Sequence, residues 1–182
     1  MEEALLKRVM PHSIEAEQSV VGAMILDRDA VTVATEMLSA EDFYQKQYSI
    51  LFEAMTELYS EGKPIDLITL QNRLKEKDVP PEISSLEFVR DMITTVPTSA
   101  NVKYYAKIVS EKAMLRRLIK VNEEVANSCY LEKESTEVIL EEAEKKLFNI
   151  LQKTNGGEFV PIQQVVLNAI NNIEKASKLK GS

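Results

Sequence analysis

Glycine and proline are scarce in this sequence of 182 residues, which holds five of the first and six of the second. Both residues interrupt regular backbone structure, so their scarcity favours long elements with few breaks. Hydrophobic residues make up 45% of the chain, which is enough to form a buried core. Because Glu, Lys, Leu, Ala and Ile are frequent, the composition predicts an all-α fold.

Side chains that commonly carry chemistry are also few, with one histidine, His12, and one cysteine, Cys129. A zinc site or a histidine acid–base pair needs companions that the sequence lacks, and a single cysteine excludes an internal disulfide. Phosphate-binding loops, dinucleotide motifs and nucleophile elbows are absent. We therefore expect no catalytic, metal or cofactor site in these residues. We also expect His12 to be structural or exposed, and Cys129 to be buried on an apolar helix face.

Long apolar runs are missing as well, since no stretch approaches the roughly 18 residues that a membrane-spanning helix needs. The first ten residues, MEEALLKRVM, are too acidic and have too short an apolar stretch for a secretory signal. The sequence therefore predicts a cytoplasmic protein with no membrane association.

Positive charge is scarce in the first part of the chain. Residues 1–100 carry 9 Lys or Arg against 18 Asp or Glu, whereas residues 101–182 carry 13 against 11. Nucleic-acid binding depends on neutralising phosphates, so the first hundred residues are poorly suited to bind DNA by themselves.

The first unit, residues 1–99, has the pattern of several short helices joined by tight turns, which is typical of a compact helical globule. Capping residues predict that helices start after Ser13, Asp66 and Ser84. A turn is expected over residues 77–85, where two prolines and two serines occur.

Two longer helices follow, over about residues 100–129 and 136–152. Their length and short connection predict an antiparallel helical hairpin, which we assign to residues 100–153. Apolar residues cover more than one face of the first helix, so this surface either meets another protein or packs wholly on the globule. The candidate self-association residues are Tyr105, Val109, Leu118, Leu140 and Leu147.

The charge changes sign along the hairpin. Residues 103–120 carry six basic side chains and one acidic, whereas residues 123–144 carry eight acidic side chains and one basic. Such stretches can pair within one hairpin or between two copies of it. Because exposed ion pairs stabilise weakly, charge would select the register and the partner more than it would stabilise the fold.

The third unit, residues 154–182, begins with a flexible joint at Gly156 and Gly157. Pro161 suits a first helical turn, and apolar residues then recur every three or four positions along one face. The sequence therefore predicts a C-terminal helix whose apolar face needs a partner.

Five segments between Pro11 and Ile119 occur in a characteristic order: PHSIEAEQSVVGAMILD, EDFYQKQYSILFEAM, GKPIDLITL, VPTSANVKYYAKIV and LRRLI. They resemble the N-terminal region of the bacterial replicative DNA helicase, the DnaB family, and LEEAEKKLFNI extends the resemblance to about residue 151. One departure is SSLEFV, residues 84–89, where the family often has Gly-Gly-x-x-Tyr-Leu. Phe88 stands at the tyrosine position, and the missing glycines indicate a different local turn.

The resemblance implies a non-catalytic region that ends in a linker helix and leads to a RecA-like ATPase domain outside these 182 residues. That domain would use ATP and magnesium and would make the main contacts with DNA. The parent protein would be an ATP-dependent helicase. The linker helix would pack on the neighbouring subunit through Ile162, Val166, Ile170 and Ile173.

The resemblance also implies partners: further copies of the chain, from a dimer up to a hexameric ring, and the C-terminal domain of DnaG primase. The sequence leaves open whether a helicase loader binds here. On the first hairpin helix, an apolar strip with a basic rim suits a partner helix with aliphatic anchors and acidic edges. The candidate primase-docking residues are Leu115, Arg116, Ile119, Lys120 and Val125.

Two alternatives remain open. Ile119 and Val125 can instead be core residues of the hairpin. The whole chain can instead be a free-standing helical adaptor unrelated to replication, whereas a small hydrolase or nuclease is disfavoured because no catalytic set is present. The main hypothesis is a ring-assembly and primase-docking domain of a replicative helicase.

Overall fold

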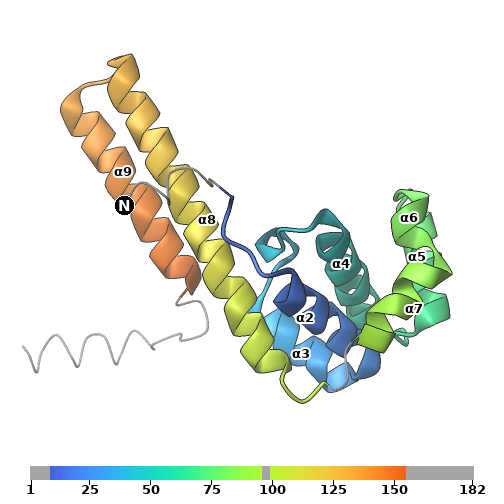
Figure 1. Cartoon of the computed structure of the whole chain (residues 1–182). Helices are drawn as coiled ribbons and strands as arrows, with labels where there is room; N and C mark the ends of the chain where they lie inside the picture. The colour runs from blue at the N-terminus through green and yellow to red at the C-terminus, as the bar shows by residue number, and fades with distance from the viewer. Residues whose placement is uncertain (1–8, 96–98, 155–182) are drawn as a thin grey trace, which may run out of the picture.

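The computed structural model describes residues 9–95 and 99–154, and every regular element in these ranges is helical. The elements are α2 (Ile14–Leu26), α3 (Arg28–Met37), the 3₁₀ helix η1 (Ala40–Asp42), α4 (Lys46–Ser60), α5 (Leu67–Glu76), α6 (Pro81–Ser84), α7 (Leu86–Thr95), α8 (Val102–Leu131) and α9 (Thr136–Thr154). The predicted all-α fold is therefore confirmed for the described residues. Helices α2 to α7 form a globule, from which α8 and α9 extend side by side (Figure 1).

Helix α2 lies at the centre of the globule and packs against α3, α4, α7 and α8. Its Val20, Val21 and Met24 are at most 1% exposed. Every residue from Val20 to Ile25 is buried, and such a stretch is stable only when other elements cover it, which explains why four helices surround α2. Burying each such side chain contributes about 1.5–3 kcal/mol.

The first half of α8 belongs to the same core. Val102, Ala106, Val109 and Ala113 are buried, and their spacing of three or four residues places them on one face of the helix. Beyond Ala113 no residue of α8 is buried in the described structure, and the helix continues to Leu131 beside α9 (Figure 1).

Two of the predicted helix caps are confirmed. Ser13 Oγ accepts a hydrogen bond from the Ala16 N–H at 3.2 Å and caps α2. Asp66 Oδ1 accepts hydrogen bonds from the N–H groups of Ile68 and Thr69, both at 2.9 Å, and caps α5. Each cap satisfies backbone donors that have no partner inside the helix.

The predicted cap at Ser84 is wrong. Ser84 is the last residue of α6, a short helix that begins at Pro81, where the sequence predicted only a turn. Ser85 Oγ accepts a hydrogen bond from the Phe88 N–H at 3.2 Å and so caps α7 instead. Proline at the first position of α6 explains why a helical turn forms there, since its missing N–H is not needed at that position.

The turn of the hairpin is shorter than the sequence predicted. Helix α8 continues through Cys129 to Leu131, and Glu132 ends it in the left-handed conformation with φ of 48°. Cys129 is exposed, so the prediction of a buried cysteine is wrong. Among the described residues, only α9 lies alongside this end of α8, because the globule is at the other end (Figure 1). One neighbouring helix cannot cover every side.

Glu17 is a buried carboxylate, 1% exposed, on α2. Its Oε1 accepts a hydrogen bond from the Tyr44 N–H at 2.7 Å, and its Oε2 accepts one from the Gln45 N–H at 3.0 Å. The pKa of Tyr48 on α4 is raised, first by burial of its phenol group and second by the negative charge of Glu17. Glu17 therefore fixes the peptide that connects η1 to α4.

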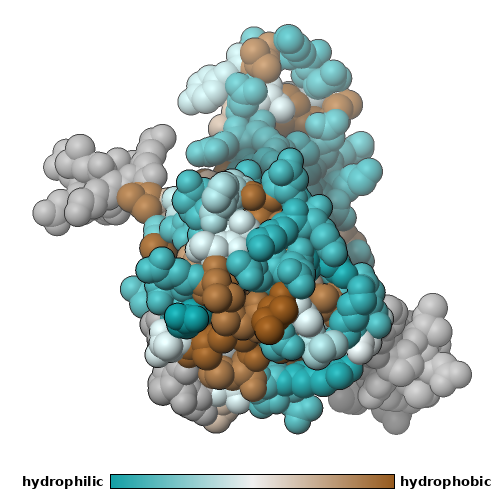
Figure 2. Space-filling view, turned by 90° about the vertical axis from the view of Figure 1, so that its right-hand side faces the viewer, coloured by the Kyte–Doolittle hydropathy of each residue, from teal (hydrophilic) through white to brown (hydrophobic). Residues whose placement is uncertain are grey.

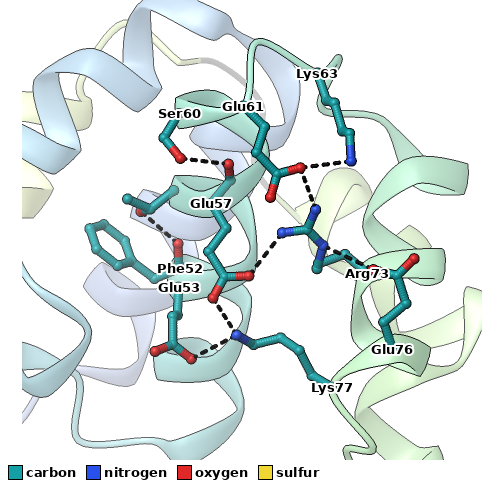
Figure 3. A network of polar contacts seen from close by, with 10 residues as sticks. Phe52, Glu53, Glu57, Ser60, Glu61, Lys63, Arg73, Glu76 and Lys77 are labelled. Carbon is teal, nitrogen blue, oxygen red and sulfur yellow. Dashed lines mark hydrogen bonds and ion pairs between the residues drawn. The ribbon is translucent and has the colours of Figure 1, made fainter.

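Helices α4 and α5 are also joined by a charged network (Figure 3). Arg73 Nη1 lies 2.9 Å from Glu57 Oε2, and its Nη2 lies 2.7 Å from Glu61 Oε2. Lys77 forms a second ion pair with Glu57. Hydrogen bonds from Arg73 first, and then from Lys63, lower the pKa of Glu61 from its usual 4.5 to about 2.

Candidate protein interaction surface on the hairpin

Helix α9 carries apolar side chains on two sides. Ile150 is 7% exposed and lines a groove with Val121 of α8, so one side of α9 faces α8. The other side is exposed. We name it the outer stripe of α9; it consists of Leu140, Leu147, Phe148 and Leu151, which are 65%, 39%, 55% and 59% exposed. A surface helix of a monomer needs only one apolar side, so the outer stripe indicates a further contact.

The structure separates the five residues that were predicted to mediate self-association. Leu140 and Leu147 belong to the outer stripe of α9, whereas Tyr105 and Leu118 on α8 are half-buried. Val109 is 1% exposed and lies in the core of the globule. Because α8 uses this face to pack on α2 and α3, Val109 is not available to a second subunit, and we exclude it from the surface.

The residues predicted to dock primase differ in exposure. Leu115 is 44% exposed, Lys120 is exposed, and Ile119 and Val125 are half-buried. Arg116 is also half-buried, and its guanidinium binds within the chain, as described below. The expected basic rim consisted of Arg116 and Lys120, and of these two Lys120 is exposed.

A groove of about 290 Å³ opens between α8 and α9 beside Lys120. Its lining consists of Arg117, Lys120, Val121, Glu124, Asn149 and Ile150. The valine and isoleucine provide apolar surface, and Lys120 provides positive charge. This combination can receive an aliphatic side chain from a partner that carries acidic residues nearby.

Charges on the two helices of the hairpin are not matched within one chain. Lys146 Nζ lies 2.9 Å from Glu124 Oε2, and this is the only ion pair between α8 and α9 in the described residues. The antiparallel register that this pair fixes brings acidic residues together on both sides of the turn. The basic stretch, residues 103–120, lies mainly on the half of α8 that packs on the globule. In the described residues, no ion pair joins the basic stretch to the acidic stretch within one hairpin, and Lys146 lies outside the basic stretch.

The globule has an apolar surface of its own. The end built by α5, α6 and α7, which faces the viewer in Figure 2, shows a contiguous hydrophobic patch among hydrophilic residues. On α5, Ile68 is 68% exposed, the largest value for an apolar side chain of the described globule. This patch is a second surface that a partner protein can use.

The described residues show no arrangement suited to metal chemistry. Within residues 9–95 and 99–154, no group of three or more His, Cys, Asp or Glu side chains can hold a metal ion. In the same ranges, no helix combines the length and apolar character that crossing a membrane requires. The predicted contact residues of the linker helix, Ile162, Val166, Ile170 and Ile173, lie outside the described residues.

Phe148 and Leu151 are surface residues that the sequence-based candidates omitted. Both belong to the outer stripe of α9. Leu151 carries a signal, because it lies eleven positions from Leu140 and four from Leu147, and these spacings place residues on the same face of a helix. Phe148 follows Leu147 directly and widens that face. The apolar residues of α9 therefore cover two faces of the helix.

The comparisons with known proteins agree with this architecture. The family described as DnaB-like helicase N terminal domain matches residues 9–111. The chain is 38% identical over 181 residues to the replicative DNA helicase DnaC of Bacillus subtilis (strain 168), covering 100% of this chain and 40% of that protein. It is also 38% identical over 174 residues to the replicative DNA helicase DnaB of Geobacillus stearothermophilus, covering 96% and 38%. The chain thus spans about two fifths of the length of these curated relatives.

Solved structures share the fold. The crystal structure of the N-terminal domain of DnaB helicase from Mycobacterium tuberculosis matches with a TM-score of 0.72 and 35% identity, covering 77% of this chain and 99% of that one. A DnaB-like replicative helicase, described together with its interactions with primase, matches with a TM-score of 0.63 and 19% identity, covering 87% and 35%. The latter likeness concerns the fold alone.

Proposed function

Because the chain belongs to the family of DnaB-like helicase N-terminal domains, we propose that it is the ring-assembly and primase-docking region of a hexameric replicative helicase. The outer stripe of α9 is the observation that carries the assembly part of the proposal. Its four large apolar side chains are exposed, although they project from a regular and well-formed helix. Contact with a second copy would remove them from water.

Charge favours a second copy of the same hairpin as the occupant of the outer stripe. The end of the hairpin near the turn is acidic on both helices, and the end near the globule is basic. If two hairpins pack in opposite directions, the acidic end of each lies beside the basic end of the other. A two-fold axis generates this arrangement, since each surface then meets its own copy.

For primase docking, we propose the groove between α8 and α9 beside Lys120. The apolar lining of Val121 and Ile150 would hold an aliphatic anchor, and Lys120 would attract acidic residues around it. Support for this partner comes from the family, since a helicase of the same fold is described with its interactions with primase. The proposal does not extend to a helicase loader.

We further propose the division into a globule over residues 1–99, a hairpin over residues 100–153 and a linker unit over residues 154–182. In this division the region is non-catalytic. ATP, magnesium and the main DNA contacts would belong to a RecA-like domain of the parent helicase, which acts in the bacterial cytoplasm. Support for this division of labour comes from the relatives, which are named replicative DNA helicases and of which the chain covers only about two fifths.

Binding of the C-terminal domain of a bacterial primase to the assembled protein tests the docking proposal. We expect Ile150→Ala to increase the dissociation rate, because Ile150 provides apolar lining of the groove. We expect Lys120→Glu to lower the association rate, more strongly at low salt. The matched control is Ile68→Ala, which removes an equal side chain from an exposed position on α5 of the globule.

Light scattering must show that each variant has the oligomeric state of the wild type. If Ile150→Ala binds primase normally in that state, the groove is not the docking site. If Ile68→Ala alone weakens binding, the docking site lies on the α5–α7 end of the globule instead.

A further inference from the structure

The apolar attachment of α8 to the globule ends before the helix does. Ala113 is the last buried residue of α8, and residues 114–131 extend beyond it as one arm of the hairpin. A small rotation at this point would be amplified along the hairpin, because the arm is long and rigid. Packing of the first half of α8 sets its general direction, and the contacts immediately beyond Ala113 adjust the direction in which the hairpin points.

Arg116 lies one turn beyond this last buried residue and binds two separate chain segments. Its Nη1 donates a hydrogen bond to the carbonyl of Pro11 at 2.7 Å, and its Nη2 donates one to the carbonyl of Asp42 at 2.6 Å. Pro11 belongs to the extended segment before α2, and Asp42 is the last residue of η1. One guanidinium thus joins α8 to two parts of the globule.

The Arg116 side chain is held from a further side. Its Cζ lies 5.7 Å from the centroid of the Tyr44 ring, against which His12 also stacks, with ring centroids 4.2 Å apart. Burial lowers the pKa of the Arg116 guanidinium, which nevertheless stays charged at neutral pH. A charged group in this position is stable only because carbonyl oxygens and an aromatic ring surround it.

Asp42, one of the two acceptors of Arg116, is itself fixed. Asp42 is 6% exposed, forms an ion pair with Arg117, and accepts a hydrogen bond from the Ser39 N–H at 2.7 Å. Glu17 holds the peptide that follows, as described above. The segment of the globule that contacts Arg116 is therefore held in place by other contacts, so it does not move together with α8.

We propose that Arg116 is a positioning residue that sets the angle between the hairpin and the globule, and that the hairpin swings when its two carbonyl contacts are lost. The fork of an arginine reaches two acceptors from different segments at once, which a lysine ammonium does not. The neighbouring Arg117 contributes a single ion pair, for which lysine is a sufficient replacement. The proposal concerns the geometry of one chain and does not depend on any partner.

The angle can be followed by double electron–electron resonance between two spin labels. Cys129, the only cysteine of the chain, is exposed near the turn of the hairpin and carries one label. Asn72→Cys, at an exposed position on α5, provides the second label on the globule. Labelled chains are diluted into an excess of unlabelled Cys129→Ser chains, so that distances within one chain dominate in an oligomer.

We expect Arg116→Ala and Arg116→Lys to broaden and shift the distance distribution, while circular dichroism shows an unchanged helix content. Arg117→Lys should leave the distribution unchanged, as should Arg90→Ala, which removes an exposed arginine of α7. An unchanged distribution in Arg116→Lys would overturn the proposal, even if Arg116→Ala fails to fold. The proposal is equally wrong if Arg90→Ala broadens the distribution as much as Arg116→Lys does, because the effect would then be unspecific.

Discussion

Lys146 on α9 and Glu124 on α8 form the one ion pair that connects the two helices of the hairpin in the described residues, with Nζ and Oε2 2.9 Å apart. The hydrogen bond from Lys146 lowers the pKa of Glu124. Acidic residues of both helices gather near the turn, and the basic residues of α8 lie nearer the globule. This uneven distribution is the basis for expecting that a second copy provides the missing charges.

Charge reversal on α8 tests this expectation. Lys103 is exposed at the basic end of the hairpin, and we expect Lys103→Glu to weaken self-association, with a larger effect at low salt because salt screens exposed charges. Lys75→Glu, an equal change at an exposed position on α5, should leave self-association unaltered. Sedimentation at two salt concentrations measures both variants, and equal effects of the two would exclude a specific role for the hairpin.

Glu17→Gln should destabilise the fold strongly for so small a change. The amide nitrogen of glutamine cannot accept a hydrogen bond, so one of the N–H groups of Tyr44 and Gln45 loses its partner in a buried site. Such a loss costs about 1–3 kcal/mol. Urea unfolding followed by circular dichroism measures it, with Glu15→Gln on the exposed side of the same helix as the control. If Glu17→Gln unfolded at the same urea concentration as the wild type, the two hydrogen bonds that Glu17 accepts would not stabilise the fold.

Arg73→Gln should reduce stability at neutral pH but not in strong acid. Folding lowers the pKa of Glu61 to about 2, below its usual 4.5, so its contribution is fully present above about pH 4.5. The contribution is lost as the pH falls toward 2, where the carboxylate becomes protonated in both states. The difference in urea midpoint between wild type and variant should therefore shrink over this interval. A constant difference would show that Arg73 stabilises through packing alone.

Ser85→Ala should cost about 1 kcal/mol, the usual value for loss of an N-cap. The neighbouring Ser84→Ala should stay within about 0.5 kcal/mol of the wild type, because Ser84 does not cap a helix. Thermal unfolding of the two variants side by side decides the matter. If Ser84→Ala instead lowered the stability more than Ser85→Ala, Ser84 would be the cap of α7, as the sequence alone predicted.

Local sequence patterns predicted the helices well, because capping residues and apolar spacing act over a few neighbouring positions. Ser13 and Asp66 were found in this way, whereas the cap of α7 was assigned to Ser84 instead of the adjacent Ser85. Exposure was harder to predict, since it depends on where the hairpin leaves the globule. Cys129 has an apolar helical setting in the sequence but lies beyond the reach of the globule.

The role of Arg116 could not be predicted at all. Its acceptors, Pro11 and Asp42, are 105 and 74 positions away in the sequence, so no local pattern reveals them. An arginine on a helix with exposed neighbours is more typical of a solvated surface or a partner contact, which is how the sequence placed it. Only the packing of α8 on the globule brings its guanidinium to those carbonyls.

The mass of the protein in solution tests the account most directly. The chain has a mass of 20.6 kDa, and we expect light scattering after size exclusion to give a multiple of this value over the micromolar range. The double variant Leu147→Glu with Leu151→Glu places two charges in the outer stripe of α9 and should return the mass to 20.6 kDa with the helix content unchanged. A wild-type protein that remains at 20.6 kDa at high micromolar concentration would contradict assembly through this surface.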